Sequence, residues 1–157
     1  MLTWLSKHLF FPLSEAREGA QRTAYLAELS ASQWWPVERI RRVQWEKLTG
    51  IVEYAFNHCP YYQDHFSKLG FRGKLGNWQE FCQLPILTKQ HVREHWEMLL
   101  SREFQLQELV EAKTGGSTGT ALTVYADKKC REQRNAAAMR SDRWAGWDIG
   151  MQVAAVW

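Results

Sequence analysis

A stretch rich in glycine and hydroxyl side chains constrains this chain more than any other: Lys113-Thr114-Gly115-Gly116-Ser117-Thr118-Gly119-Thr120. It joins two segments, Gln107 to Lys113 and Ala121 to Ala126, whose composition is typical of strands. Glycines tolerate positive φ, so consecutive backbone N–H groups can turn into one anion-binding concavity. Serine and threonine hydroxyls can donate further hydrogen bonds to phosphate oxygens. The stretch therefore predicts a loop that holds the phosphates of a nucleotide.

Two common phosphate loops do not fit this stretch. The Walker loop needs a second glycine followed by Lys-Ser/Thr, and the residue five places after Gly115 is Thr120 with no such pair behind it. The Rossmann fingerprint needs three glycines before a helix, whereas here a strand follows Gly119. What remains is a hydroxyl-rich loop between two strands, which by composition alone is also typical of an ordinary surface turn.

Length and charge narrow the class of protein. A chain of 157 residues with 45% hydrophobic residues can bury a core, and a net charge of +3 is too mild to predict a nucleic-acid partner. No apolar run is long enough for a membrane span. The three cysteines, Cys59, Cys82 and Cys130, lack metal-binding spacing, and unpaired reduced thiols favour a cytoplasmic location.

Several residues have more than one interpretation. His91 and His95 stand four residues apart, as metal ligands on one helix face do, but without a nearby third ligand we favour surface or interface histidines. Tyr61, Tyr62 and Trp96 could line a ligand pocket, although core packing is the more frequent role. The apolar segment from Met1 to Phe11 could rest as a short helix on a membrane or on the domain, and we favour the domain.

The fold class expected is α/β, with a helical N-terminal half leading into a mixed sheet. Helices are predicted over Pro12–Trp35 with Ser14 as N-cap, and over Val37–Asn57, Tyr61–Leu69 and Lys128–Trp144. Two more are predicted with their caps: a short helix through Cys82 capped by Asn77, and a helix over Lys89–Leu99 capped by Thr88. The apolar run Met151–Trp157 predicts a buried strand. Because that strand would lack neighbours, we expect the chain to be the N-terminal part of a longer polypeptide.

The order of several motifs resembles a known family. Thr114 to Ala121 is similar to the phosphate-binding loop of the adenylate-forming (AMP-binding) superfamily, in its phenylacetate–CoA ligase-like and capsule-biosynthesis-associated branch. The stretches that continue the resemblance are His58-Cys59-Pro60-Tyr61-Tyr62, Leu84-Pro85-Ile86-Leu87-Thr88-Lys89, Val124-Tyr125-Ala126-Asp127 and Trp144-Ala145-Gly146-Trp147-Asp148-Ile149-Gly150. The resemblance covers roughly residues 37–157.

The resemblance implies an incomplete enzyme. Residues 1–36 would be an N-terminal helical extension, and residues 37–157 the truncated N-terminal part of the large adenylation domain, which begins that superfamily's mixed sheet. The family activates a carboxylate with ATP and Mg²⁺, giving an acyl-adenylate and pyrophosphate, and then transfers the acyl group to a thiol, often that of coenzyme A. Thr114, Ser117, Thr118 and Thr120 would supply hydroxyls, and Gly115, Gly116 and Gly119 the backbone shape.

The sequence departs from the family at Thr120, where many members carry lysine, and at Ala121, where many carry proline. Losing the lysine removes a positive charge beside the phosphates. The family's remaining pockets and its catalytic lysine lie downstream, so no catalytic residue is assigned here. Two other functions stay open: a non-catalytic interaction module whose loop is vestigial, and an inactive fragment.

Overall fold

The computed structural model describes residues 2–114 and 121–152, and these form two compact units. The first unit holds the residues up to Trp35 together with those from Lys128 onward, and the second unit is Pro36–Asp127. The first unit therefore combines the N-terminal residues with the last helix. In the described residues no helix is long and apolar enough to cross a membrane.

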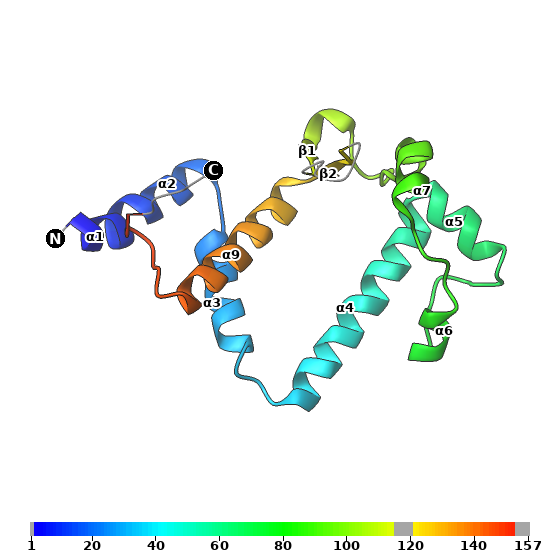
Figure 1. Ribbon diagram of the computed structural model, residues 1–157, viewed down its shortest axis with the longest axis horizontal. Helices are drawn as coiled ribbons and strands as arrows, with labels where there is room; N and C mark the ends of the chain where they lie inside the picture. Colours follow the sequence, from blue (N-terminus) through cyan, green and yellow to red (C-terminus); the bar gives the residue numbers. More distant parts are fainter. Residues whose placement is uncertain (1, 115–120, 153–157) are drawn as a thin grey trace. The chain divides into compact units, whose positions relative to one another are not determined.

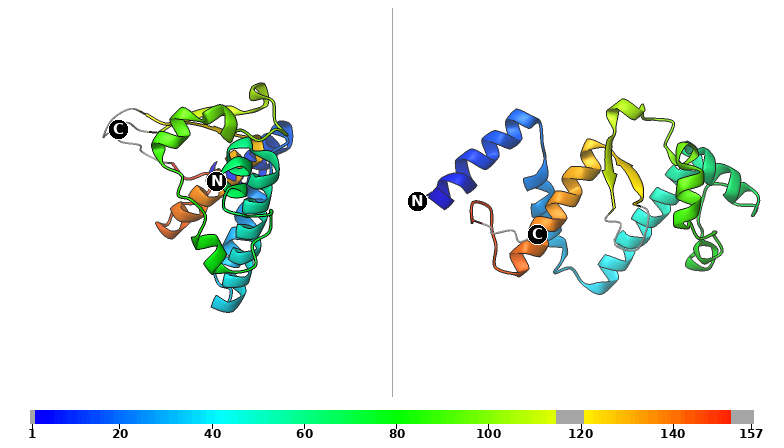
Figure 2. Two further views of the ribbon diagram at one scale, coloured as in Figure 1. Left: turned by 90° about the vertical axis from the view of Figure 1, so that its right-hand side faces the viewer. Right: turned by 45° about the horizontal axis from the view of Figure 1, so that its top comes forward.

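The first unit is helical. Its elements are α1 (Leu2–Leu5), the π-helical turn η1 (Ser6–Phe10), α2 (Phe11–Glu18), α3 (Arg22–Ser32) and α9 (Lys128–Trp144). Helices α3 and α9 lie side by side although about a hundred residues separate them in sequence (Figures 1 and 2). They can approach closely because Ala136, which is fully buried, faces Leu26 with only a methyl group. Ile149 completes this core.

The predicted helix Pro12–Trp35 is wrong in one respect, because it is two helices. Gly19 ends α2 in the left-handed region, with φ +59°, and the N–H of Ala20 donates to the carbonyl of Glu15 over 2.8 Å. Ser14 is therefore not an N-cap. It lies inside α2, where its hydroxyl donates to Glu18 over 2.8 Å.

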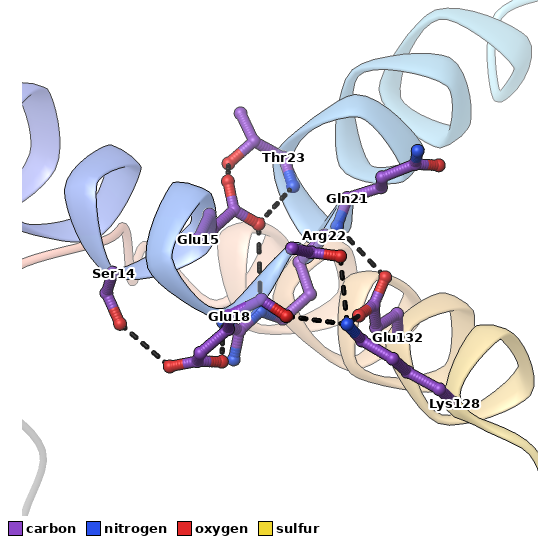
Figure 3. Close-up of polar contacts among 9 residues, drawn as sticks. Ser14, Glu15, Glu18, Gln21, Arg22, Thr23, Lys128 and Glu132 are labelled. Carbon is purple, nitrogen blue, oxygen red and sulfur yellow. Dashed lines mark hydrogen bonds and ion pairs between the residues drawn. The ribbon is translucent and has the colours of Figure 1, made fainter.

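Charged side chains form hydrogen bonds with backbone groups at the two helix ends that this break creates (Figure 3). The amine of Lys128 on α9 donates to the carbonyls of Glu18 and Gly19, over 2.6 and 2.9 Å. The carboxylate of Glu132 accepts from the N–H of Gln21, over 2.9 Å. Between α2 and α3, the buried carboxylate of Glu15 accepts hydrogen bonds from the N–H and the hydroxyl of Thr23. Apart from the bond of the Thr23 hydroxyl, each of these bonds satisfies a backbone group that a helix end leaves without an internal partner.

The predicted turn after α9 docks the N-terminal helices. Asp148 forms ion pairs with Lys7 and with Arg143, whose Nη2 lies 2.8 Å from Oδ1. A Cβ at Gly150 would stand 2.7 Å from the carbonyl oxygen of Thr3, so glycine is needed for this close approach. One face of the N-terminal segment thus rests on the first unit, as the sequence favoured. Met151 and Gln152 are exposed and outside any strand, and the rest of the predicted last strand lies outside the described residues.

The second unit combines helices with one small sheet. Its elements are α4 (Val37–His58), α5 (Pro60–Ser67), α6 (Trp78–Cys82), α7 (Lys89–Glu94), α8 (Trp96–Leu99), the 3₁₀ turn η2 (Leu106–Glu108), β1 (Val110–Lys113) and β2 (Thr123–Ala126). The α/β class is therefore confirmed at the coarse level of many helices with a two-stranded antiparallel sheet. Val52, Tyr61 and Phe66 are buried where α4 meets α5.

Local predictions outside the N-terminal helices were mostly confirmed. Helices α4 and α9 begin where they were predicted to begin, and α4 ends one residue later. Asn77 caps α6 by accepting from the N–H of Glu80 over 2.9 Å. The helix predicted from Lys89 breaks at His95 (φ −127°, ψ 25°) into α7 and α8. Both strands are shorter than predicted, partly because η2 occupies the start of the first one.

Two exposed glycines give a matched stability test. Gly50 lies inside α4 and Gly70 follows α5 with φ +78°, and an added Cβ would meet nothing within 4 Å at either position. Gly50→Ala is expected to raise the free energy of unfolding by about 0.5–1 kcal/mol, because alanine loses less entropy in a helix. Gly70→Ala is expected to lower it by about 1–2 kcal/mol, because alanine is disfavoured in the left-handed region. Chemical denaturation measures both, and equal signs would contradict the backbone assignment.

Acid should weaken the first unit through Asp148. Its bonds to Lys7, to the N–H of Ile149 and to Arg143 lower the pKa of this carboxyl from 3.8 to about 2. A lowered pKa in the folded state gives stability that is complete above about pH 4 and lost as the pH falls toward 2. Because Asp148 is one-third exposed, solvent screens part of this effect, and Asp148→Asn should lower the free energy of unfolding by about 1 kcal/mol at neutral pH. The variant's free energy of unfolding should also change less with pH between about pH 4 and pH 2.

Asp64 provides the control for this acid effect. It pairs with Lys68, four residues away on the solvent-exposed side of α5. Asp64→Asn removes the same charge at a solvated position and should change stability much less. Denaturation curves across pH 2 to 7 compare the two variants, and an equal acid response in both would contradict the role of Asp148.

Candidate functional site

The two strands bring the ends of the predicted phosphate loop together. β1 and β2 are antiparallel, with Val110 opposite Ala126 and Lys113 opposite Thr123. Thr114 extends the pairing on both of its polar groups: its N–H donates to the carbonyl of Leu122, and its hydroxyl accepts from the N–H of Leu122, each over 2.9 Å. A strand thus stands on each side of the stretch, as the sequence predicted, and the two strands are antiparallel.

Only one of the predicted site residues lies in the described part of the chain. Thr114 has its hydroxyl oxygen engaged by Leu122, so the hydroxyl proton remains as its donor. The other predicted phosphate-binding residues, Gly115, Gly116, Ser117, Thr118, Gly119 and Thr120, lie outside the described residues.

A cavity of about 290 Å³ lies beside these strands. One wall comes from α7 and α8 and the other from the strands and the residues that precede β2. The lining residues that carry charge, hydrogen-bonding groups or aromatic rings are Arg93, Trp96, Glu111, Thr123 and Tyr125. The rings of Trp96 and Tyr125 are 5.8 Å apart. The cavity therefore combines an aromatic wall with charged groups, which is the composition of small-molecule sites.

The N-terminus of α7 fixes the position of Arg93. Thr88 caps the helix by accepting from the N–H of His91 over 3.2 Å, and Nδ1 of His91 accepts in return from the N–H of Thr88 over 3.4 Å. His91 thus forms the second half of the capping box at the start of α7. Arg93 follows two residues later and reaches the cavity wall.

The histidine pair is built into a cluster around a buried tyrosine. The ring of Tyr61 stacks on His65 at 3.9 Å and lies 5.4 Å from His95. Nδ1 of His65 is bonded to the carbonyl of Tyr61 over 2.9 Å. No group of three or more potential metal ligands occurs in the part of the chain that the structure describes. The sequence favoured surface or interface histidines at these positions; in the structure the rings of His91 and His95 lie 6.4 and 5.4 Å from the ring of Tyr61.

Charges of both signs lie on the cavity side of β1. Glu111 and Lys113 are two residues apart and so share one face of the strand. Their side chains form an ion pair of 3.2 Å, and Glu111 lines the cavity. Lys113 therefore stands on the cavity face of β1. Arg93 and Glu111 line the cavity, and Lys113 reaches it through its ion pair with Glu111.

A second cavity of about 400 Å³ is mostly apolar and lies among α4, α5, α6 and the segment after α6. Tyr62 lines it, and burial raises the pKa of that phenol. The three aromatic residues considered as pocket residues from sequence therefore lie in different places. Trp96 lines the first cavity, Tyr62 lines the second, and Tyr61 is buried.

Sequence reasoning missed Arg93 and Glu111 as cavity residues. Arg93 stands three residues before Trp96, and Glu111 stands two residues before Lys113, so each lies close in sequence to a residue of the predicted pocket or loop. Nothing in those patterns says that α7 and β1 face one another. Comparisons with family models, with curated proteins and with solved structures find no match to this chain.

Thr114 offers a test of how the loop ends are held. Thr114→Val keeps the shape of the side chain but removes the acceptor for the N–H of Leu122. We expect a loss of about 1 kcal/mol in local stability, since one hydrogen bond of this kind contributes that much. Thr114→Ser, which keeps the hydroxyl, should retain most of it. Amide hydrogen exchange of Leu122 measures the change, and equal protection in both variants would contradict the contact.

Proposed function

We propose that this chain is the N-terminal part of an adenylate-forming ligase that activates a carboxylate with ATP. The observation that carries the proposal is the cation-bearing cavity at the base of the strand–loop–strand unit. Its support from sequence is the hydroxyl-rich loop between those strands and the order of the motifs around it. The proposed chemistry needs positive charge and donors next to the polyphosphate, and both kinds of group lie near this cavity.

In the proposed reaction a carboxylate oxygen attacks the α-phosphorus of ATP and pyrophosphate leaves. Negative charge then builds on the leaving group, so fixed N–H and hydroxyl donors lower the barrier. The hydroxyl proton of Thr114 and the groups of the following loop would supply those donors. Arg93 and Lys113 would supply positive charge, which answers the absence of a lysine at Thr120. Transfer of the acyl group to a thiol such as that of coenzyme A belongs to regions beyond these residues.

Mg²⁺ is expected to accompany ATP, and the residues present fit such an ion. The carboxylate of Glu111, which lines the cavity, would supply an oxygen ligand. Mg²⁺ usually keeps several waters and binds through one or two carboxylates together with substrate phosphates, so one acid is sufficient. When bound, the ion would neutralise part of the phosphate charge.

Nucleotide binding to the chain itself tests the proposal. Trp96 in the cavity wall should report MgATP as saturable quenching of tryptophan fluorescence. Arg93→Gln is expected to weaken binding about tenfold, since a hydrogen bond to a charged group contributes about 1.5–3 kcal/mol. Ser117→Ala combined with Thr118→Ala should weaken it by a similar factor. Arg41→Gln, at an exposed position of α4, is the charge-matched control and should bind as the parent does.

The outcomes separate the proposal from its alternatives. A folded sample that gives no response to MgATP would contradict nucleotide binding by this chain. Binding that Arg93→Gln and Arg41→Gln reduce equally would reflect general charge attraction and contradict the cavity assignment. In a longer polypeptide that carries this chain, pyrophosphate release that depends on a carboxylate would distinguish a ligase from a nucleotide-binding module.

A non-catalytic interaction module is the second candidate function. The observation that favours it is the exposed apolar rim of the second cavity, where Ile51 is 60% and Ile86 is 83% exposed. Isolated exposed apolar residues are ordinary, but two at the mouth of an apolar cavity suit a binding surface. Absence of nucleotide binding, together with a partner whose affinity falls in Ile86→Glu, would favour this candidate.

A further inference from the structure

A third cavity, of about 330 Å³, lies in the second unit between α6 and the segment that follows α5. It shares no lining residue with the cavity beside the strands. Its polar and charged lining residues are Arg72, Lys74, Glu80 and Gln83, and apolar side chains complete the wall. The volume falls within the range of small-molecule sites, about 300–1,000 Å³. The cavity can therefore enclose a small molecule that carries charge.

The segment that carries both cations is anchored by the residues that alternate with them. Exposed Arg72 and Lys74 flank Gly73, which is buried and has φ +92°. A Cβ at Gly73 would stand 3.2 Å from the ring of Phe56 on α4, so glycine lets the backbone pass close to this helix. The ring of Phe71 packs edge-on against Phe56, with the ring centroids 5.3 Å apart. Arg72 and Lys74 therefore extend from a backbone that is fixed against α4.

The one carboxylate in the cavity lining is bonded to neutral donors. Oε2 of Glu80 accepts from the N–H of Gly76 over 2.7 Å, and Oε1 accepts from Nδ2 of Asn77 over 2.9 Å. Neither Arg72 nor Lys74 forms an ion pair within the part of the chain that the structure describes. Two cations and one carboxylate leave the lining with a net charge of +1. The cavity thus offers two cations that no described acid pairs with, and it complements an anion.

We propose that this cavity binds the phosphate group of a small phosphorylated molecule. A phosphate monoester carries about −1.5 to −2 charges at neutral pH, so it matches two unpaired cations better than a carboxylate, which carries one. The guanidinium of Arg72 can bind two phosphate oxygens at once, and Lys74 supplies a point charge. The amide of Gln83 can donate a further hydrogen bond. This inference goes beyond the proposed ATP chemistry and does not depend on it.

Titration of the whole chain with phenyl phosphate tests the proposal, because this probe joins a phosphate monoester to one apolar ring. Phe71 lines the cavity and offers that ring an apolar contact. Two-dimensional NMR of the backbone amides locates the binding, and the largest shifts are expected at Gly70, Gly73 and Gly76. Binding should weaken at high salt, because screening reduces the attraction between the exposed charges. Phenyl sulfate has the same shape with a single negative charge and should bind several-fold more weakly.

A pair of double variants separates the cavity from the general charge of the chain. Arg72→Gln combined with Lys74→Gln should weaken the binding of phenyl phosphate at least about tenfold, since both charge-assisted hydrogen bonds to the phosphate are lost. Arg41→Gln combined with Lys47→Gln removes the same charge from exposed positions of α4 and should bind as the parent does. The amide spectrum of each variant checks that it stays folded.

Three results would overturn the proposal. The first is a folded parent whose amide signals do not respond to phenyl phosphate. The second is equal weakening in the two double variants, or equal affinity for phenyl sulfate, because either would remove the match between two fixed cations and a dianion. The third is a response confined to α7 and the strands, which would place the phosphate in the cavity of the proposed ATP site instead.

Discussion

The first unit depends on how α9 satisfies the break between α2 and α3. A helix end leaves carbonyls and N–H groups without internal partners, and a hydrogen bond to such a group contributes about 0.5–1.5 kcal/mol. Lys128 provides donors for the end of α2, and Glu132 provides an acceptor beside the start of α3 (Figure 3). Because the two residues stand four apart, one face of α9 serves both helix ends. The same helix brings Ala136 to Leu26, so polar satisfaction and apolar packing specify the same arrangement.

How much of this fold could be predicted follows from how local each signal is. The start and approximate end of α4, and the caps Asn77 and Thr88, depend on residues within one helical turn, and they were predicted correctly. The break at Gly19 was missed. Its neighbouring residues are good helix formers, and the groups that stabilise it, Lys128 and Glu132, lie more than a hundred residues away in sequence. Tertiary contacts of that kind override local propensity.

The candidate site shows the same limit. The residue types of the loop and its place between two strands could be inferred from sequence, because strand signals and glycines are local. The position of the cavity could not, since it depends on α7 and α8 packing toward β1 and β2 across the segment between them. The kink at His95 contributes to that packing, because it redirects the chain between Arg93 and Trp96, and both line the cavity. No pattern in the sequence predicted that kink.

The charge at the cavity bears directly on the departure at Thr120. A lysine inside a phosphate loop places one cation at a fixed point, whereas Arg93 approaches from a separate helix and Lys113 from the strand before the loop. Glu111 pairs with Lys113, which reduces the positive field while no ligand is present. An arriving polyphosphate would compete with Glu111 for Lys113, and a divalent cation bound by Glu111 would release the lysine. Under the proposed function, ATP affinity should therefore depend on Mg²⁺ more steeply than in a site with an unpaired loop lysine, because the ion that Glu111 binds would also free Lys113 for the phosphates.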